Sequence, residues 1–296
     1  MTTSSEIPTL PTAKSGDLSL AYETFGDPGD PALLLIMGLG AQMIGWPEDL
    51  CRQLAQEGLH VIRFDNRDAG LSTHLHEAGR PDLRAVAKHE AQPPYTLTDM
   101  AADAIAVLDA LGIEQAHIAG GSMGGMIAQE VAIEYPGRVL TLTSIFSTPA
   151  SGVGKPTPEA QAALTGPPAT TVEEAGQRAV QNAAVFGSTG FPLDEERVVW
   201  RAQEQFRRAN DPAGFARQLA AIYGSRDRRP GLAAVSVPTL VIHGEADTLV
   251  QPEGGQATAD AVPGARLVTY PGMGHDLPAQ LWPDYVKEIS ALVRSV

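Results

Sequence analysis

The sequence has 296 residues, enough for one large α/β domain or for one domain with a sizeable insertion. Its 43% hydrophobic and 19% charged residues are typical of globular proteins, and no apolar run approaches the roughly 18–20 residues of a membrane span. A formal net charge of −14 argues against nucleic acid and anionic membranes as partners. It favours neutral or cationic small molecules, unless a local arginine cluster reverses the sign.

The first residues and the single cysteine bear on location and redox chemistry. Met1 to Asp17 is polar and lacks the apolar stretch of a secretory signal, so we expect a cytoplasmic protein; a chain trimmed of its signal would look the same. Cys51 is the only cysteine, which excludes an intramolecular disulfide. We expect a packed thiol there, because no neighbouring residue would activate it for catalysis.

Short aliphatic runs alternate with amphipathic segments from about residue 17 to 147 and again from about 237 to 296. This alternation predicts a mostly parallel sheet with helices on both faces. The expected strands are Leu18–Thr24, Ala32–Met37, His60–Phe64, Ala116–Ala119, Val139–Phe146, Thr239–His243 and Arg266–Tyr270. The expected helices are Trp46–Glu57, Leu97–Leu111, Ser122–Tyr135, Glu253–Ala261 and Gln280–Val296.

The strand signal disappears between residues 148 and 231. Helical segments are expected there instead, at Pro158–Leu164, Val172–Phe186, Leu193–Ala209 and Pro212–Tyr223. We therefore predict a core of residues 1–147 and 232–296 and a helical cap of residues 148–231, inserted between two core strands. A shorter irregular stretch, Thr73–Tyr95, is long for a loop, and its pattern indicates no role.

The most informative motif is Gly120-Gly121-Ser122-Met123-Gly124-Gly125, directly after a predicted strand and at the start of a predicted helix. A Gly-x-Ser-x-Gly pattern in that context is typical of a nucleophile elbow. The sharp turn leaves no room for side chains beside the serine, and the helix N-terminus favours negative charge. The alternative is a glycine-rich turn with a helix-capping serine.

A serine hydroxyl needs a base, and in such sites the chain order is serine, acid, histidine. The candidate base is His275, in a glycine-containing loop after the last predicted strand. His60, His117 and His243 lie within or at the end of strands, and His74, His76 and His89 lie in the irregular stretch.

The acid should follow the preceding strand, where Glu245 and Asp247 both stand. We choose Asp247 for its spacing after the strand; it would fix the imidazole tautomer and stabilise the imidazolium. His243, Glu245 and Asp247 also suggest a metal site, but no further His or Cys cluster accompanies them. We predict neither a metal nor a cofactor.

Two backbone N–H groups are candidates for an oxyanion hole. One belongs to Met123, the residue after the proposed nucleophile. The other is expected in the loop Met37-Gly38-Leu39-Gly40, and we assign it to Leu39. Together these donors would stabilise the oxygen of a tetrahedral intermediate.

With these motifs the chain resembles the α/β-hydrolase superfamily over almost its whole length. Phe64-Asp65-Asn66-Arg67-Asp68-Ala69-Gly70-Leu71-Ser72 is similar to that family's Asp-x-Arg-Gly-x-Gly-x-Ser loop, with Asp68 in place of a common glycine; Arg67 is expected to be structural. The Met37–Gly40 loop, Gly45-Trp46-Pro47 and Leu59–Asp65 resemble the branch of bacterial esterases that contains aclacinomycin methylesterase. The resemblance implies a Ser122, Asp247 and His275 triad, a helical cap and a small-alcohol ester as substrate.

The predicted function is hydrolysis of a carboxylic ester through an acyl-enzyme. The same triad serves lactonases, amidases, carbon–carbon bond hydrolases and cofactor-free perhydrolases, and a non-catalytic ligand receptor can retain it as well. Apolar residues of the cap and the acidic charge balance suggest a small to medium, apolar and uncharged substrate. The sequence indicates no oligomeric state.

Overall fold

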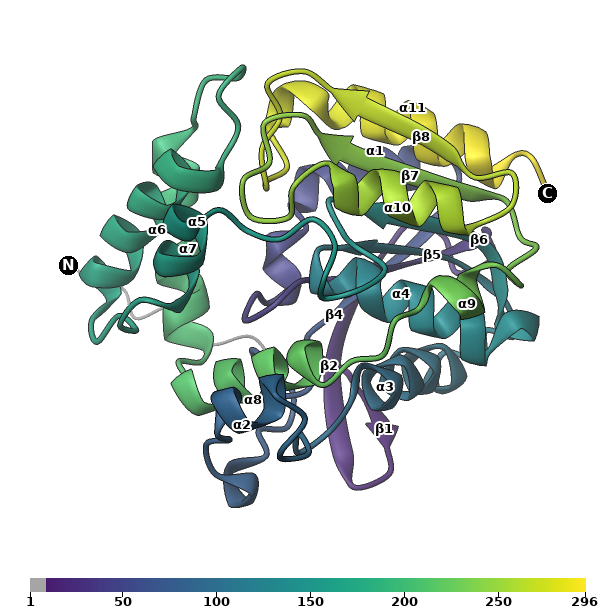
Figure 1. The fold of residues 1–296 in the computed structure, drawn as a ribbon. Coiled ribbons are helices and arrows are strands. Elements are labelled where there is room, and N and C mark those ends of the chain that lie inside the picture. Colours follow the sequence, from purple (N-terminus) through teal and green to yellow (C-terminus); the bar gives the residue numbers. More distant parts are fainter. Residues whose placement is uncertain (1–8) are drawn as a thin grey trace.

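A computed structural model describes residues 9–296, which contain one eight-stranded sheet with the order β1-β2-β4-β3-β5-β6-β7-β8 (Figure 1). The strands are β1 (Thr12–Ser15), β2 (Leu18–Phe25), β3 (Ala32–Ile36), β4 (His60–Phe64), β5 (Ala116–Gly121), β6 (Val139–Ile145), β7 (Thr239–Gly244) and β8 (Arg266–Tyr270). Strands β1 and β2 pair antiparallel to their neighbours, and all other pairs are parallel. The predicted parallel sheet is therefore present.

Helices cover both faces of this sheet. They are α1 (Glu48–Gln56), α2 (Leu83–Ala87), α3 (Leu97–Ala110), α4 (Met123–Glu134), α5 (Pro158–Thr165), α6 (Val172–Phe186), α7 (Glu195–Arg208), α8 (Pro212–Tyr223), α9 (Arg229–Leu232), α10 (Glu253–Ala261) and α11 (Trp282–Val293). Short 3₁₀ turns lie at η1 (Met43–Gly45), η2 (His76–Ala78), η3 (Pro136–Arg138) and η4 (Ala279–Leu281).

Strand β3 shows why the sheet is stable between two helical layers. Leu34 and Ile36 point into the core under α3 and α4, whereas Leu33 and Leu35 point into the core under α1 and α11. All four side chains are buried, because successive residues of a strand face opposite sides and both sides are covered. This packing explains the unbroken apolar run of Ala32–Ile36.

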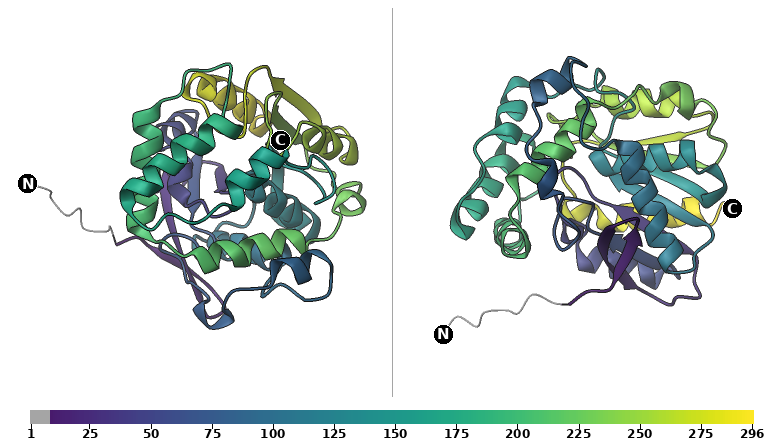
Figure 2. Two further views of the ribbon diagram at one scale, coloured as in Figure 1. Left: turned by 60° about the vertical axis from the view of Figure 1, so that its left-hand side comes forward. Right: turned by 90° about the horizontal axis from the view of Figure 1, so that it is seen from below.

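Helices α5 to α8 follow β6 in the chain and precede β7, and they lie together on one side of the sheet (Figures 1 and 2). Their positions match the four helices expected in this region to within two residues at either end. Helices α6 and α7 pack closely, since a Cβ atom on Gly176 would lie 3.0 Å from Val199. The division into a core and a cap with limits at residues 148 and 231 stays a prediction.

Apart from the 3₁₀ turns, one short strand and two short α-helices were not predicted. Strand β1 has four residues with a single buried side chain, too few to give a periodic signal. Helix α2 interrupts the stretch Thr73–Tyr95, which was expected to be irregular; the Asp82 side chain caps it by accepting the N–H groups of Arg84 and Ala85. Helix α9 has only four residues. Each element is shorter than the window in which helical or strand periodicity is recognisable.

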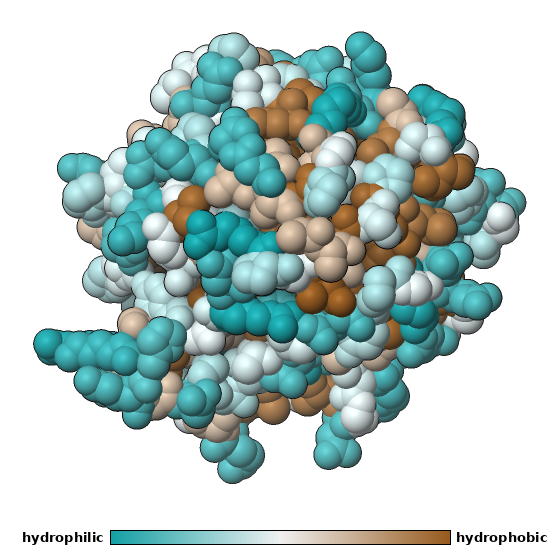
Figure 3. Space-filling model, turned by 45° about the vertical axis from the view of Figure 1, so that its right-hand side comes forward, coloured by the Kyte–Doolittle hydropathy of each residue, from teal (hydrophilic) through white to brown (hydrophobic). Residues whose placement is uncertain are grey.

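The surface is mixed in character. The face in Figure 3 is mainly hydrophilic, with smaller groups of hydrophobic residues between the polar ones. Among residues 9–296, no helix has the length and apolar character to cross a membrane. The expectation for Met1–Asp17, that it contains no secretory signal, falls in large part on residues 1–8 and so lies outside the described residues.

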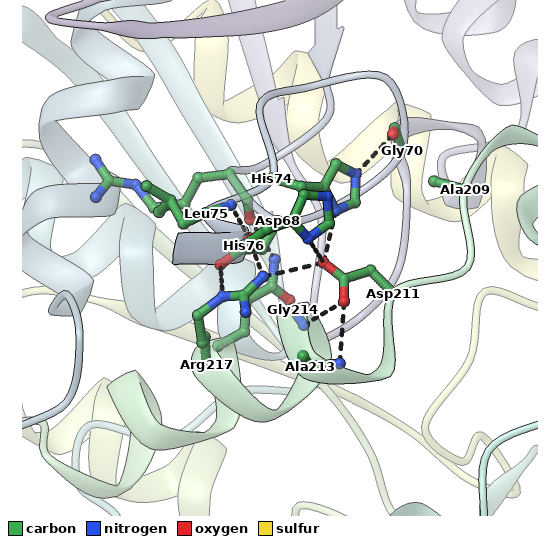
Figure 4. Close-up of polar contacts among 12 residues, drawn as sticks. Asp68, Gly70, His74, Leu75, His76, Ala209, Asp211, Ala213, Gly214 and Arg217 are labelled. Carbon is green, nitrogen blue, oxygen red and sulfur yellow. Dashed lines mark hydrogen bonds and ion pairs between the residues drawn. The ribbon is translucent and has the colours of Figure 1, made fainter. Parts of the chain in front are cut away.

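Asp68 ties α8 to the loop after β4 (Figure 4). Its carboxylate accepts two hydrogen bonds from Arg217, at 2.7 and 2.8 Å, and both side chains are fully buried. It also accepts the hydroxyl of Tyr95 at 2.8 Å and the N–H of Leu75 at 2.7 Å. Burial opposes its ionisation, but the Arg217 hydrogen bond and the other donors outweigh burial and lower the pKa of Asp68. The Asp68 carboxylate therefore connects the loop after β4 with Tyr95 and with α8.

The backbone of Asp68 explains why related loops carry glycine at this position. Its φ is 64°, in the left-handed region that favours glycine, although aspartate tolerates it better than most residues. The neighbouring Arg67 binds the Asp103 carboxylate and the carbonyl of Asp99, the structural role that was expected of it.

The substitution Asp68→Gly tests how much the buried ion pair contributes to the stability of the protein. Glycine relieves the backbone, yet it removes the main partner of the buried Arg217 guanidinium, which keeps only Asp211 and the carbonyl of Gly79. We therefore expect a loss of roughly 1–3 kcal/mol in the free energy of unfolding. Denaturant titration measures this quantity. The double variant Asp68→Gly/Arg217→Leu should regain part of the loss, because the buried guanidinium that lost its main partner is gone while Asp211 keeps its hydrogen bonds to His74, Ala213 and Gly214. A single variant as stable as the parent protein would contradict the assignment.

His117 in β5 makes stability dependent on pH. Burial lowers the pKa of its imidazole from 6.5 to about 4, so between these pH values the unfolded chain binds a proton that the folded chain does not. The free energy of unfolding should therefore fall as the pH drops through this window. His117→Gln should flatten that slope in denaturant titrations at pH 7, 6, 5 and 4; equal slopes in both proteins would refute the argument.

Candidate active site

Ser122 lies at the turn between β5 and α4, with φ 57° and ψ −121°. This left-handed backbone is strained for a residue with a side chain, and such strain is found mainly at functional sites. The turn forms because its flanks are bare: a Cβ atom on Gly120 would lie 2.0 Å from the carbonyl oxygen of Gly124, and one on Gly124 would lie 2.1 Å from that of Ile36. The close approach of α4 to β5 and β3 therefore depends on glycine.

The imidazole of His275 joins the other two predicted residues. Its Nε2 atom lies 2.9 Å from Ser122 Oγ, and its Nδ1 atom lies 2.7 Å from Asp247 Oδ2. The ring packs against Phe146, with ring centroids 4.8 Å apart. Its backbone N–H donates to the carbonyl of Phe186 at 2.7 Å, so the last residue of α6 holds the histidine loop. The structure thus brings the three side chains together in the order Ser, His, Asp.

The two candidate acids have different surroundings. Asp247 is buried, and its Oδ1 atom accepts the N–H groups of Leu249 and Val250, both at 2.9 Å. These bonds fix the carboxylate and leave Oδ2 directed at His275. Glu245 is exposed and accepts the hydroxyl of Thr269 at 2.8 Å. The geometry therefore favours Asp247 over Glu245 as the partner of His275.

Two backbone N–H groups near Ser122 have no partner among the described residues. Neither Leu39 nor Met123 donates its N–H to any residue between 9 and 296. The Leu39 loop lies against the serine, since a Cβ atom on Gly38 would be 3.1 Å from Ser122 Cβ. The following residue, Gly40, donates its N–H to the Gln218 side chain at 2.8 Å, which fixes the loop to α8. Free donors beside a nucleophile are what an oxyanion hole requires.

Two other buried residues, His243 and Cys51, could in principle take part in catalysis, but their surroundings do not fit such a role. His243 is buried, its Nε2 atom lies 2.8 Å from the carbonyl oxygen of Val250, and burial lowers its pKa. Cys51 is a buried thiol, as expected, and burial raises its pKa to about 12. A neutral thiol is a poor nucleophile.

One cluster of side chains, drawn in Figure 4, has ligand atoms close enough together to hold a metal ion. It does not include His243, Glu245 or Asp247, the residues that the sequence suggested for a metal site. His74, His76 and Asp211 place one ligand atom each within 4.8 Å of one another, the only such group found among residues 9–296. However, Arg217 donates to the same Asp211 oxygen at 3.0 Å, and His76 is largely exposed. A guanidinium on the ligand oxygen opposes a second cation there. Within the same residues, the His243, Glu245 and Asp247 group forms no such cluster.

Ser122 and His275 open into a cavity of about 620 Å³. Its walls come from the Met37–Gln42 loop, from the segment after β6, and from α5 to α8. Apolar residues line much of it, including Met37, Leu39, Met126, Phe146, Leu164, Phe186, Val198, Phe215, Leu219 and Ile222. A volume of this size fits a small to medium organic molecule.

Comparisons with known proteins agree with this architecture. A family model described as alpha/beta hydrolase fold matches residues 31–279. Rhodomycin D methylesterase DauP of Streptomyces sp. (strain C5) is 30% identical over 302 residues, which cover 94% of this chain and 96% of that protein. The 3-oxoadipate enol-lactonase 2 of Acinetobacter baylyi is 30% identical over 247 residues, 83% of this chain and 82% of that protein.

Among solved structures, an enol-lactonase from Burkholderia xenovorans LB400 superposes with a TM-score of 0.75 at 24% identity, covering 96% of this chain and all of that one. At that identity the likeness shows the fold alone. The methylesterase relatives agree with the branch that the Met37–Gly40 loop and its flanking motifs resemble. By its sequence and its sheet topology, the chain belongs to the α/β-hydrolase fold family.

Proposed function

We propose that this protein is a serine esterase that hydrolyses a carboxylic ester of a small to medium, largely apolar molecule through an acyl-enzyme. The observation that carries the proposal is the continuous pair of contacts from Ser122 Oγ to His275 Nε2 and from His275 Nδ1 to Asp247 Oδ2, at 2.9 and 2.7 Å. Relatives named as methylesterases and as an enol-lactonase support ester cleavage, because a lactone is a cyclic ester.

In the proposed acylation step, Ser122 Oγ attacks the ester carbonyl while His275 Nε2 takes the hydroxyl proton. Asp247 accepts the Nδ1–H bond and stabilises the imidazolium that forms. The N–H groups of Leu39 and Met123 stabilise the negative charge on the carbonyl oxygen by hydrogen bonding. Met123 is the first residue of α4, where the helix dipole also favours negative charge. His275 then gives the proton to the leaving alcohol, and the acyl group remains on Ser122.

Deacylation repeats these steps with water as the nucleophile. His275 takes a proton from the water, the water oxygen attacks the acyl carbonyl, and Ser122 leaves with the proton from His275. The product acid departs through the cavity. The buried position of Asp247 keeps its charge close to the imidazole throughout, where the local dielectric constant is low.

Other reactions use the same residues. Lactone hydrolysis is the second candidate, favoured by the enol-lactonase relatives; carbon–carbon bond hydrolysis and perhydrolysis need the same triad. A panel of 4-nitrophenyl esters, lactones and peracid formation separates these activities. A non-catalytic receptor would turn over no compound of the panel.

Ser122→Ala tests the nucleophile. We expect kcat/KM for 4-nitrophenyl butyrate to fall by roughly 10⁴-fold or more, because no other group can form the acyl-enzyme. A fluorophosphonate probe followed by peptide mapping should label Ser122 in the parent protein. A label on another residue, or full turnover by the alanine variant, would overturn the assignment.

Asp247→Asn tests whether Asp247, and not Glu245, is the carboxylate that assists His275. The amide cannot hold the required tautomer or stabilise the imidazolium, so we expect kcat to fall by roughly 10³- to 10⁴-fold. Glu245→Gln is the matched control, at a position two residues away, and it should stay within about twofold of the parent rate because that exposed side chain contacts Thr269 and not His275. A larger loss of kcat in Glu245→Gln than in Asp247→Asn would exchange the two roles.

A further inference from the structure

The charge of the cavity differs from that of the whole chain. Four cationic side chains line it, namely Arg80, Lys155, Arg178 and Arg201, against the carboxylates Asp68, Asp211 and Asp276. The acidic chain, with a net charge of −14, therefore has a local group of cations at its proposed active site. The sequence predicted an uncharged substrate, unless a local cluster of arginines made the charge of the site positive. The cavity contains such a cluster.

Each carboxylate in the cavity wall is already engaged. Asp68 and Asp211 both accept hydrogen bonds from Arg217, and Asp211 also caps α8 by accepting the N–H groups of Ala213 and Gly214. Asp276 accepts the hydroxyl of Ser188. Arg217 thus shares its charge between Asp68 and Asp211, whereas Asp276 has only a neutral hydroxyl and keeps its charge near Arg201. The four cations of the cavity wall still outnumber the three carboxylates.

Among the cations, Arg201 is distinguished by its surroundings. Arg80 and Lys155 are exposed to solvent, and Arg178 donates to the carbonyl of Ala163 at 3.2 Å. Arg201 is partly buried and makes no hydrogen bond or ion pair with any residue between 9 and 296. Burial lowers its pKa, while the charge of Asp276 partly offsets this. A partly buried arginine without a partner among these residues has N–H donors available to a bound molecule.

The position of Arg201 places it in the wall of the cavity that contains Ser122 and His275. Val198, Arg201 and Gln205 all line the cavity from α7, at the spacing that places residues on one face of a helix. Asp276, whose charge acts on Arg201, directly follows His275 in the chain. Arg201 is therefore near enough to the residue after the proposed base for the charge of Asp276 to act on it.

From these contacts we infer that Arg201 is a specificity-determining residue that binds a carboxylate of the substrate, so that the natural substrate is a monoanionic ester with a largely apolar body. A planar guanidinium and a carboxylate form two parallel hydrogen bonds, which gives both affinity and a fixed orientation. This inference rests on the proposed function for the identity of the reacting group, but its binding step is independent of catalysis.

Binding to a protein that cannot turn over tests the inference directly. In the Ser122→Ala background, calorimetry compares monomethyl glutarate, which carries one carboxylate, with the neutral dimethyl glutarate. We expect the monoanion to bind roughly 10- to 100-fold more tightly. The preference should disappear in Ser122→Ala/Arg201→Met and return in part in Ser122→Ala/Arg201→Lys. Equal affinity for the two esters in Ser122→Ala would overturn the inference.

Turnover provides the second measurement and separates the two proposals. The parent protein is assayed with mono-4-nitrophenyl glutarate and with its methyl ester, and the ratio of the two kcat/KM values is taken. Arg201→Met should lower this ratio roughly 10-fold or more. Arg207→Met, a change of an exposed arginine on the same helix that does not line the cavity, should leave it unchanged. A ratio that Arg201→Met leaves unaltered contradicts the inference.

The two proposals fail in different ways. If neither nitrophenyl ester is hydrolysed but the monoanion binds through Arg201, the esterase function is wrong and the carboxylate site stands. If both esters are hydrolysed at equal rates and bind equally, the function stands and the role of Arg201 is wrong.

Discussion

The site depends on the strained turn that presents Ser122. Its left-handed backbone is held because α4 packs so closely on the sheet that Gly124 nearly touches the carbonyl of Ile36 in β3. The constraint is one of space, because a Cβ atom on Gly120 or Gly124 would overlap a backbone carbonyl oxygen. Once β5 enters this turn, Ser122 must face the ends of the parallel strands, where His275 and Asp247 arrive from β8 and β7. The sheet thus positions three residues that are far apart in the chain.

Buried ion pairs attach the helices over the site to the loop below it. Arg217 of α8 binds Asp68, and Arg208 of α7 binds Asp65 at 2.6 Å, with all four side chains nearly or fully out of solvent. Such pairs contribute little net stability relative to apolar packing, but they tolerate no unpaired partner. They therefore specify how α7 and α8 sit on the core. The aspartate that replaces glycine at position 68 belongs to this arrangement.

Most of the sheet and the proposed triad could be predicted from local patterns. Buried parallel strands leave unbroken apolar runs, and the glycine motif and the order of Ser122, Asp247 and His275 are readable in one dimension. The ion pair of Asp68 and Arg217 was not predictable, because its partners lie 149 residues apart and no periodicity links them. Arg201 resembles any charged residue of an amphipathic helix until the cavity beside it is known. The catalytic roles themselves stay predictions.

The hydrogen bond from the backbone of His275 to Phe186 has a mechanical consequence. Phe186 is the final residue of α6, so this helix and the imidazole loop are joined directly and are not two independent parts. A displacement of α6, which lines the cavity, would also displace the loop that carries the imidazole. The residues that follow α6 add further bonds, because Ser188, Thr189 and Gly190 also contact the histidine loop. The position of α6 and the alignment of the proton-transferring ring are therefore coupled through the backbone.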